Sequence, residues 1–131
     1  MNNKRIGNQM ERRVAETLAV NGYWVHRIQD NYNGQPFDMI AIKNDEAFCI
    51  ECKHCAVNRF KFNRLEFNQR NAFDRLEMCN STGYIAIQFG TDCKFYLVEY
   101  SHIKSLELYK HNYLDEEELI DGYNCRKFNY C

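Results

Sequence analysis

The chain has 131 residues, of which 45% are hydrophobic and 27% are charged, and its formal net charge at pH 7 is −1. This length suits one domain of roughly 100–200 residues, while six glycines and one proline exclude collagen-like and Pro/Gly-rich low-complexity classes. No apolar run approaches the roughly 20 residues of a membrane helix, and the first residues lack a signal-peptide pattern, so we expect a soluble, cytoplasmic protein that forms a single domain over residues 1–131.

The first part of the chain predicts a helix followed by three strands. Met10, Val14 and Leu18 recur at the i, i+4, i+8 spacing of one helix face. The next segment is aromatic and β-branched, as strands are, and it is followed by turn-forming residues. A polar tip then separates two apolar runs, which is typical of a hairpin. The expected elements are a helix at 6–21, strands at 23–28, 38–42 and 47–53, and a loop at 29–35.

The second part predicts a helix and another hairpin. Asn63 followed by Glu66 has the spacing of a capping box, and the apolar residues that follow recur on one helix face. The signals weaken after the second hairpin, so we expect residues 100–131 to be an appended helical or irregular segment. The expected elements are a helix at 64–79, strands at 84–89 and 94–99, and a short helix at 115–120. Their order, αβββαββ, predicts a compact α/β domain.

The charges are distributed unevenly along the chain. Residues 4–13 hold four basic residues and one acidic residue, and residues 53–75 hold six basic residues and two acidic ones. Residues 99–121 hold seven acidic residues and two basic ones. Because local basic surface rather than total charge binds phosphate, the pattern is compatible with a nucleic-acid partner. On charge alone, ordinary solvated faces explain it equally well.

The seven cysteines are expected to be reduced thiols. An odd number argues against a disulfide framework, and Cys79 and Cys93 lie in or beside apolar segments, where thiols behave as small hydrophobes. The spacing of Cys49, Cys52 and Cys55 invites a metal-cluster hypothesis. Strand alternation disfavours it, because Cys49 and Cys52 would point to opposite faces.

The first hairpin predicts a charged site. If Ile42 pairs with Ala47, then Asp38 faces Glu51, and Lys53 shares their face of the sheet. Directly opposed residues have Cβ atoms about 4.5–5.5 Å apart. Two carboxylates at that separation repel each other unless a positive group lies between them. Mg²⁺, which binds one or two carboxylates together with substrate phosphate, would satisfy both.

Simpler interpretations of these residues remain open. Asp38, Glu51 and Lys53 could reach water at a frayed strand end. Gln69 falls in the apolar stripe of the second helix, where it needs hydrogen-bond partners, although it could instead reach solvent at the helix edge. Glu11 could approach the same cluster, or it could interact only with the dipole of the first helix.

Three sets of residues resemble known nucleases. Gln35-Pro36-Phe37-Asp38, Glu51-Cys52-Lys53 and Gln69 resemble the PD-(D/E)xK nuclease superfamily, with the proline one place earlier than in the usual motif. Residues 7–13 and 22–27 resemble archaeal Holliday junction resolvases, and residues 62–69, 83–86 and 114–123 resemble RecU-type resolvases of Gram-positive bacteria and their phages. The resemblance implies a restriction-endonuclease-like αβββαβ core with a mixed central sheet flanked by helices.

The resemblance also implies roles for individual residues. Asp38 and Glu51 would be metal ligands, together with the main-chain carbonyl of Cys52. Lys53 and Gln69 would orient the attacking water and the scissile phosphate. Glu11 would be an auxiliary catalytic acid. The implied cofactor is Mg²⁺, with Mn²⁺ as a substitute, and the implied reaction is metal-assisted hydrolysis of DNA phosphodiesters.

The implied partner is branched double-stranded DNA. Two symmetric nicks in a two-fold symmetric four-way junction call for a homodimer. Tyr23, Trp24 and Tyr32 could line its interface, although core packing is the better expectation for Trp24. The basic residues expected to contact phosphates are Lys4, Arg5, Arg12, Arg13, Arg27, Arg59, Lys61, Arg64 and Arg70.

Two other functions remain open. The loop at 29–36 is much shorter than the stalk that RecU enzymes insert there, so a non-specific or repair-type nuclease of the same fold is an alternative to a junction resolvase. A catalytically silent DNA-binding module is a second alternative. The complete set of Asp38, Glu51, Lys53 and Gln69 disfavours the silent module, because a protein without chemistry has no need to hold opposed acids.

Overall fold

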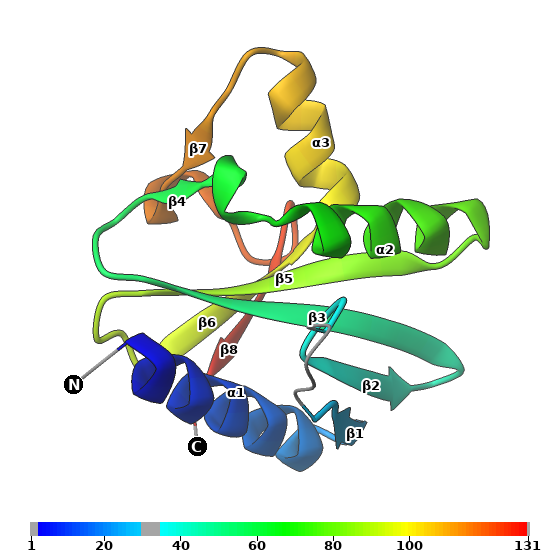
Figure 1. Cartoon of the computed structure of the whole chain (residues 1–131). Helices are drawn as coiled ribbons and strands as arrows, with labels where there is room; N and C mark the ends of the chain where they lie inside the picture. Colours follow the sequence, from blue (N-terminus) through cyan, green and yellow to red (C-terminus); the bar gives the residue numbers. More distant parts are fainter. Residues whose placement is uncertain (1–2, 30–34, 131) are drawn as a thin grey trace.

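A computed structural model describes residues 3–29 and 35–130, and its chain folds around one six-stranded sheet (Figure 1). None of the helices in this part of the chain is long and apolar enough to cross a membrane. The elements in chain order are α1 (Asn3–Val20), β1 (Trp24–Arg27), β2 (Met39–Lys43), β3 (Glu46–Cys55), β4 (Phe60–Lys61), the 3₁₀ turn η1 (Phe62–Arg64), α2 (Phe67–Met78), β5 (Thr82–Phe89), β6 (Lys94–Glu99), α3 (Tyr100–Leu108), β7 (Tyr113–Leu114), the 3₁₀ turn η2 (Glu116–Glu118) and β8 (Arg126–Asn129).

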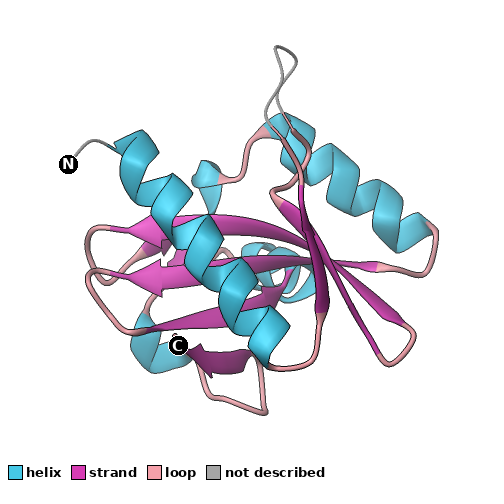
Figure 2. Cartoon of the chain, turned by 90° about the horizontal axis from the view of Figure 1, so that it is seen from below, coloured by secondary structure: helices cyan, strands magenta, loops and turns pink. Residues whose placement is uncertain are grey.

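The sheet is mixed and lies between two helical layers. Its strands run in the order β1-β2-β3-β5-β6-β8, with β3 and β5 parallel and the other neighbours antiparallel. α1 covers one face, and α2 and α3 cover the other (Figures 1 and 2). β4 and β7 form a separate two-stranded ribbon. The predicted fold class and the αβββαβ element order are confirmed.

Each face of the sheet has its own hydrophobic core. On the α1 side, the predicted stripe of Met10, Val14 and Leu18 is fully buried, which confirms the helix periodicity. On the α2 side, Phe73 and Ile103 pack with alternate residues of β5 and β6. Successive strand residues point to opposite faces, so β3 contributes Phe48, Ile50 and Cys52 to the α1 side and Cys55 to the α2 side.

The helix expected at 64–79 begins later than its sequence suggests. Residues 62–64 form the turn η1, and α2 starts at Phe67 behind a capping box made by Glu66 and Gln69. The Asn63 prediction was therefore wrong by one turn. Asn63 and Glu66 are both polar residues that are followed three residues later by a glutamate or a glutamine. The burial of Phe62 and Leu65 favours Glu66 as the start of the helix.

The last third of the chain is more regular than expected. α3 was not predicted, because its only fully buried residues are Tyr100 and Ile103 and tertiary packing rather than periodicity holds it. The short helix expected at 115–120 is only the turn η2. β8 pairs with β6, so this segment completes the main sheet rather than forming an irregular addition.

Tyr23 and Trp24 differ from the expectation. Tyr23 is buried, with its ring at the edge of Phe48, whereas the Trp24 side chain is 60% exposed. The prediction that Trp24 packs in the core was wrong, because strand alternation turns it away from α1. Tyr32 lies outside the described residues.

Gly83 sets the distance between α2 and the sheet. A Cβ atom at Gly83 would lie 2.3 Å from Cδ1 of Phe73, far inside van der Waals contact. Gly83→Ala must therefore push α2 away or force Phe73 off its rotamer, and overpacking of this kind costs about 1–3 kcal/mol. We expect a lower free energy of unfolding in urea titrations.

Gly7→Ala is the matched control. A Cβ at Gly7 meets nothing within 4 Å, and the residue lies inside α1, so this change should stabilise the protein by about 1 kcal/mol or less. The double variant Phe73→Leu/Gly83→Ala should be less destabilised than the sum of its single variants. Strict additivity would show that the Gly83–Phe73 contact does not set the packing distance.

Candidate active site

Asp38 lies directly before β2 and is fixed by its own backbone and side chain. Its N–H donates to the carbonyl of Ile50 (2.9 Å), and its carbonyl accepts from the N–H of Ile28 (2.9 Å). One oxygen of its carboxylate, Oδ2, accepts a hydrogen bond from the backbone N–H of Cys52 at 2.8 Å. This carboxylate oxygen thus takes the place of a backbone acceptor between the two strands. The bond holds the carboxylate beside β3.

The predicted register of the hairpin is confirmed. Ile42 pairs with Ala47, and the ladder runs as far as Met39 paired with Ile50. Asp38 follows this last pair, and its N–H bonds the Ile50 carbonyl. The negative charge of Asp38 is among the causes that raise the pKa of Glu51. The structure therefore brings together the pair that the sequence predicted.

Glu51 is a buried acid in an unfavourable electrostatic position. Only 6% of the residue is exposed, and Lys53 Nζ lies 3.4 Å from its Oε2. Burial and the negative charge of Asp38 raise the pKa of Glu51 to about 8, although Lys53 opposes them. One ammonium group does not balance two carboxylates, so the site favours either a bound proton or an additional cation.

Gln69 connects the start of α2 to Glu51. Its Nε2 donates to Oε2 of Glu51 at 2.8 Å, and its Oε1 accepts from the backbone N–H of Glu66 at 3.0 Å. The same side chain therefore caps α2 and holds the acid. Its burial, with 6% exposed, agrees with the prediction that it needs partners in the core.

Glu11 occupies the α1 side of the sheet. It forms an ion pair with Arg27 at 3.6 Å, between Glu11 Oε1 and Arg27 Nη2. Both lie near the Cys52 thiol, whose pKa is raised first by burial and then by the charges of Asp38, Glu51 and Glu11. The auxiliary catalytic role of Glu11 stays a prediction.

The donor set suits a hard divalent cation. Two carboxylates and the carbonyl of Cys52 offer oxygen ligands, and Mg²⁺ usually combines one or two carboxylates with water and phosphate oxygens. In residues 3–29 and 35–130, no group of three or more His, Cys, Asp or Glu side chains is placed so that it could hold a metal ion. A cation at Asp38 and Glu51 would complete its coordination with water and phosphate oxygens.

Most of the basic residues predicted to contact DNA lie on the surface. Arg13 is only partly exposed, and its guanidinium lies 3.8 Å above the ring of Tyr130. Arg64 donates from Nη1 to the Cys55 sulfur at 3.4 Å. Exposed members of the set are Lys4, Arg5, Arg12, Arg27, Arg59, Lys61 and Arg64.

Arg70 differs from the rest of this set. Its guanidinium forms two hydrogen bonds with the Glu107 carboxylate, at 2.9 and 3.2 Å, and another with the Phe62 carbonyl at 2.8 Å. These bonds join α2, η1 and α3. Sequence reasoning missed them because Glu107 is 37 residues away and carries no local signal. In the structure, Arg70 holds helices together.

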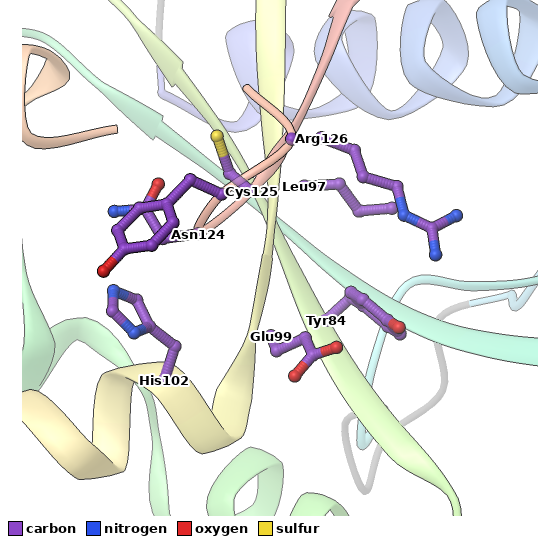
Figure 3. Close-up of a pocket in the computed structure, with 9 residues that line it drawn as sticks. Tyr84, Leu97, Glu99, His102, Asn124, Cys125 and Arg126 are labelled. Carbon is purple, nitrogen blue, oxygen red and sulfur yellow. The ribbon is translucent and has the colours of Figure 1, made fainter. Parts of the chain in front are cut away.

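Two cavities lie outside this carboxylate site. One has a volume of about 470 Å³ and is lined by residues of β5, β6, α3 and the segment before β8. His102 and Asn124 lie on one side of it, and Tyr84 and Arg126 lie on the other (Figure 3). The second, of about 420 Å³, lies between α1 and the ends of β3 and β5.

Comparison with known proteins agrees with the fold and the motif. The family model described as archaeal Holliday junction resolvase (Hjc) matches residues 2–126. A UPF0102 protein from Fusobacterium nucleatum is 30% identical over 103 residues, which cover 74% of this chain and 85% of the relative. The crystal structure of Hjc from Archaeoglobus fulgidus, a Holliday junction resolvase from an archaeal hyperthermophile, superposes with a TM-score of 0.61 at 17% identity, covering 83% of this chain and 86% of the other.

The fold is therefore that of the restriction-endonuclease-like α/β proteins, with the mixed sheet and flanking helices that Hjc also has. The match over nearly the whole length decides the family. The chain belongs to the archaeal Holliday junction resolvase family.

The raised pKa of Glu51 predicts an unusual dependence of stability on pH. The ordinary pKa is 4.5, and the folded value is about 8. Between these values the folded state binds more protons than the unfolded state, so metal-free protein should lose stability as pH rises from 4.5 to 8. Glu51→Gln keeps an acceptor for Gln69 and removes the titration. In EDTA at pH 8, the variant should be more stable than the wild type by about 2–4 kcal/mol.

Calorimetric melting at pH 5 and pH 8 measures this difference, and Mg²⁺ supplies the second comparison. A cation that displaces the proton should raise the wild-type Tm more at pH 8 than at pH 6, and it should have little effect on Glu51→Gln. Equal Mg²⁺ shifts in both proteins would show that Glu51 is not part of the cation site.

Proposed function

We propose that this protein is an endonuclease that hydrolyses DNA phosphodiesters and resolves four-way junctions by symmetric nicks. The observation that carries the proposal is the buried Glu51 carboxylate beside Asp38, with Lys53 at 3.4 Å and Gln69 at 2.8 Å. Membership in the resolvase family supports the choice of branched DNA as the substrate.

Asp38, Glu51 and the Cys52 carbonyl would hold Mg²⁺, with Mn²⁺ as a substitute. When bound, the ion would supply a nucleophile at neutral pH and charge stabilisation on the phosphate oxygens. Hydrogen bonds within the protein already hold both carboxylates in place. The Cys52 N–H fixes Asp38, and Gln69 fixes Glu51, so little reorganisation is needed when substrate arrives.

Lys53 and Gln69 would act on the substrate side of the pair. The Lys53 side chain is only 11% exposed, so its ammonium group is partly desolvated and its attraction to a phosphate oxygen is strengthened. The side-chain oxygen of Gln69 accepts a hydrogen bond from the backbone N–H of Glu66, and its amide nitrogen donates one to Glu51. It would therefore position the acid and, through it, the attacking water.

The basic residues on α1 and around η1 would contact DNA phosphates. Exposed cations of this kind bind the backbone without reading bases, and each contact makes binding more salt-dependent. Such binding suits a substrate that is defined by its branched shape. Arg12 on α1 and Arg64 on η1 are exposed members of the two basic segments.

A homodimer would place two such sites on a two-fold symmetric junction. The exposed apolar surface on β1 and β2 is the best candidate for its interface. Trp24 stacks on His26 with ring centroids 6.0 Å apart, and it pairs in register with Ile42, which is 41% exposed. Large exposed aromatic side chains of this kind are enriched at protein interfaces.

Asp38→Asn tests the proposed chemistry. Asparagine retains an acceptor for the Cys52 N–H but lacks the negative charge that a cation needs. We expect at least a hundredfold loss of junction cleavage in Mg²⁺ with unchanged junction binding, measured by gel assays on four-way junctions, linear duplexes and flaps. Asp45→Asn, in the exposed β2–β3 turn, is the matched control.

The outcomes of this assay separate the candidate functions. Paired symmetric nicks in the junction alone identify a resolvase, whereas cleavage of every substrate identifies a general nuclease of the same fold. Binding without any cleavage by the wild type would indicate a silent module. Wild-type cleavage rates for Asp38→Asn would overturn the site assignment.

Arg12 and Arg70 should respond in opposite ways to substitution. Arg12→Ala should weaken junction binding and reduce the slope of log affinity against log salt by about one unit, with no change in Tm. Arg70→Ala should lower the Tm by several degrees, since it breaks the link to Glu107 and Phe62. Arg75→Ala, on the exposed end of α2, is the control for both. An unchanged salt slope for Arg12→Ala would refute the proposed DNA surface.

A further inference from the structure

A cavity lies between α1 and the ends of β3 and β5. It measures about 420 Å³, and we call it the α1 cavity. Ile6, Met10 and Arg13 line it from α1, and His54, Ala56 and Thr91 line it from the ends of β3 and β5. We propose that the α1 cavity binds one unpaired nucleotide of the branched DNA substrate. This proposal rests on the proposed function and specifies which feature of the DNA the protein holds.

The position of the cavity connects it to the candidate active site. His54 follows Lys53 directly in β3, so consecutive residues of one strand serve the cavity on the α1 side and the carboxylate site on the α2 side. The two sites lie on opposite faces of the sheet, so one DNA strand would reach both by passing over the end of β3. The cavity also lies at the carboxyl ends of the parallel pair β3 and β5, where α/β sheets commonly bind ligands.

The lining matches the two parts of a nucleotide. Ile6, Met10 and Ala56 provide an apolar wall for the faces of a base. Arg13 provides a cation for the phosphate, and its guanidinium carbon lies 3.8 Å above the centre of the Tyr130 ring. Tyr130 is fixed in turn by its hydroxyl, which donates to Gln88 at 2.7 Å. An arginine oriented in this way loses less freedom when it binds phosphate.

Two polar side chains of the cavity wall already form hydrogen bonds within the protein. His54 Nε2 and Gln88 Nε2 both bond the Gly90 carbonyl, at 2.8 and 3.2 Å. Gln9 and Thr91 also line the cavity, and both are exposed. Their amide and hydroxyl groups can therefore reach the edge of a base.

Charge distinguishes the α1 cavity from the larger one. The first three turns of α1 carry Lys4, Arg5, Arg12 and Arg13 against one acid, Glu11. The larger cavity has one acidic and one basic side chain in its lining, Glu99 and Arg126, so it lacks such an excess of basic charge. A polyanion is therefore attracted more strongly to the α1 cavity. The volume of the α1 cavity also falls within the usual range of small-ligand sites, about 300–1,000 Å³.

The test places 2-aminopurine at the crossover of a four-way junction and measures its fluorescence on binding in EDTA, where no cleavage occurs. Transfer of the base from the stack into the cavity should raise the fluorescence at least threefold for the wild type. Ala56→Phe and Thr91→Trp fill the cavity from two walls, and both residues are exposed, so the fold should persist. Each should reduce the rise by more than half and weaken junction binding roughly tenfold.

Ala19→Phe, at the exposed end of α1 away from the cavity, is the matched control and should behave as wild type. A complex that forms without a fluorescence rise, or an undiminished rise in both filled variants, would overturn the proposal. If the wild type cleaves junctions in Mg²⁺ but shows no fluorescence rise, the proposed function holds and the proposed role of the cavity is wrong. If the fluorescence rises but no junction is cleaved in Mg²⁺, the cavity binds the base and the proposed nuclease function is wrong. Equal displacement of the signal by free deoxynucleoside monophosphate would show a site for free nucleotides rather than for a DNA strand.

Discussion

The repulsion between two carboxylates inside the protein is the constraint on which the site depends. Glu51 is buried beside Asp38, and a charged pair in that position is unstable without compensation. Lys53 and Gln69 compensate it only in part. α2 must approach the sheet closely for Gln69 to reach Glu51, and the missing side chain at Gly83 allows that approach. The packing of α2 against the sheet and the protonation state of Glu51 are therefore linked.

The arrangement of the carboxylate pair was predictable because it depends on a single hairpin. The period of a strand is two, so once Ile42 is paired with Ala47, every other partner follows. Gln69 was predictable for a similar reason, since a polar residue in an apolar helix stripe must find a partner in the core. Local patterns of this kind place the residues, while their catalytic roles rest on the resemblance and on experiment.

Features that depend on distant partners were not predictable. In the sequence, Arg70 cannot be told from its basic neighbours. Its partner Glu107 is 37 residues away, and nothing within ten residues of Arg70 indicates that pairing. Likewise, β8 is recognisable only because β6 offers it an edge. Tyr23 and Trp24 are both aromatic strand residues, and only the position of α1 decides which of them is covered.

β3 contributes residues to both faces of the sheet, so the two proposed sites share one strand. Its odd-numbered residues Glu51 and Lys53 face α2, while Cys52 and His54 face α1. The backbone N–H of Cys52 holds Asp38, so a displacement of β3 caused by DNA on the α1 side would alter the distance between the two carboxylates. In the proposed nuclease, the strand that lines the α1 cavity would also carry the cation ligands. Selectivity for branched DNA would then be expressed in the cleavage step as well as in binding.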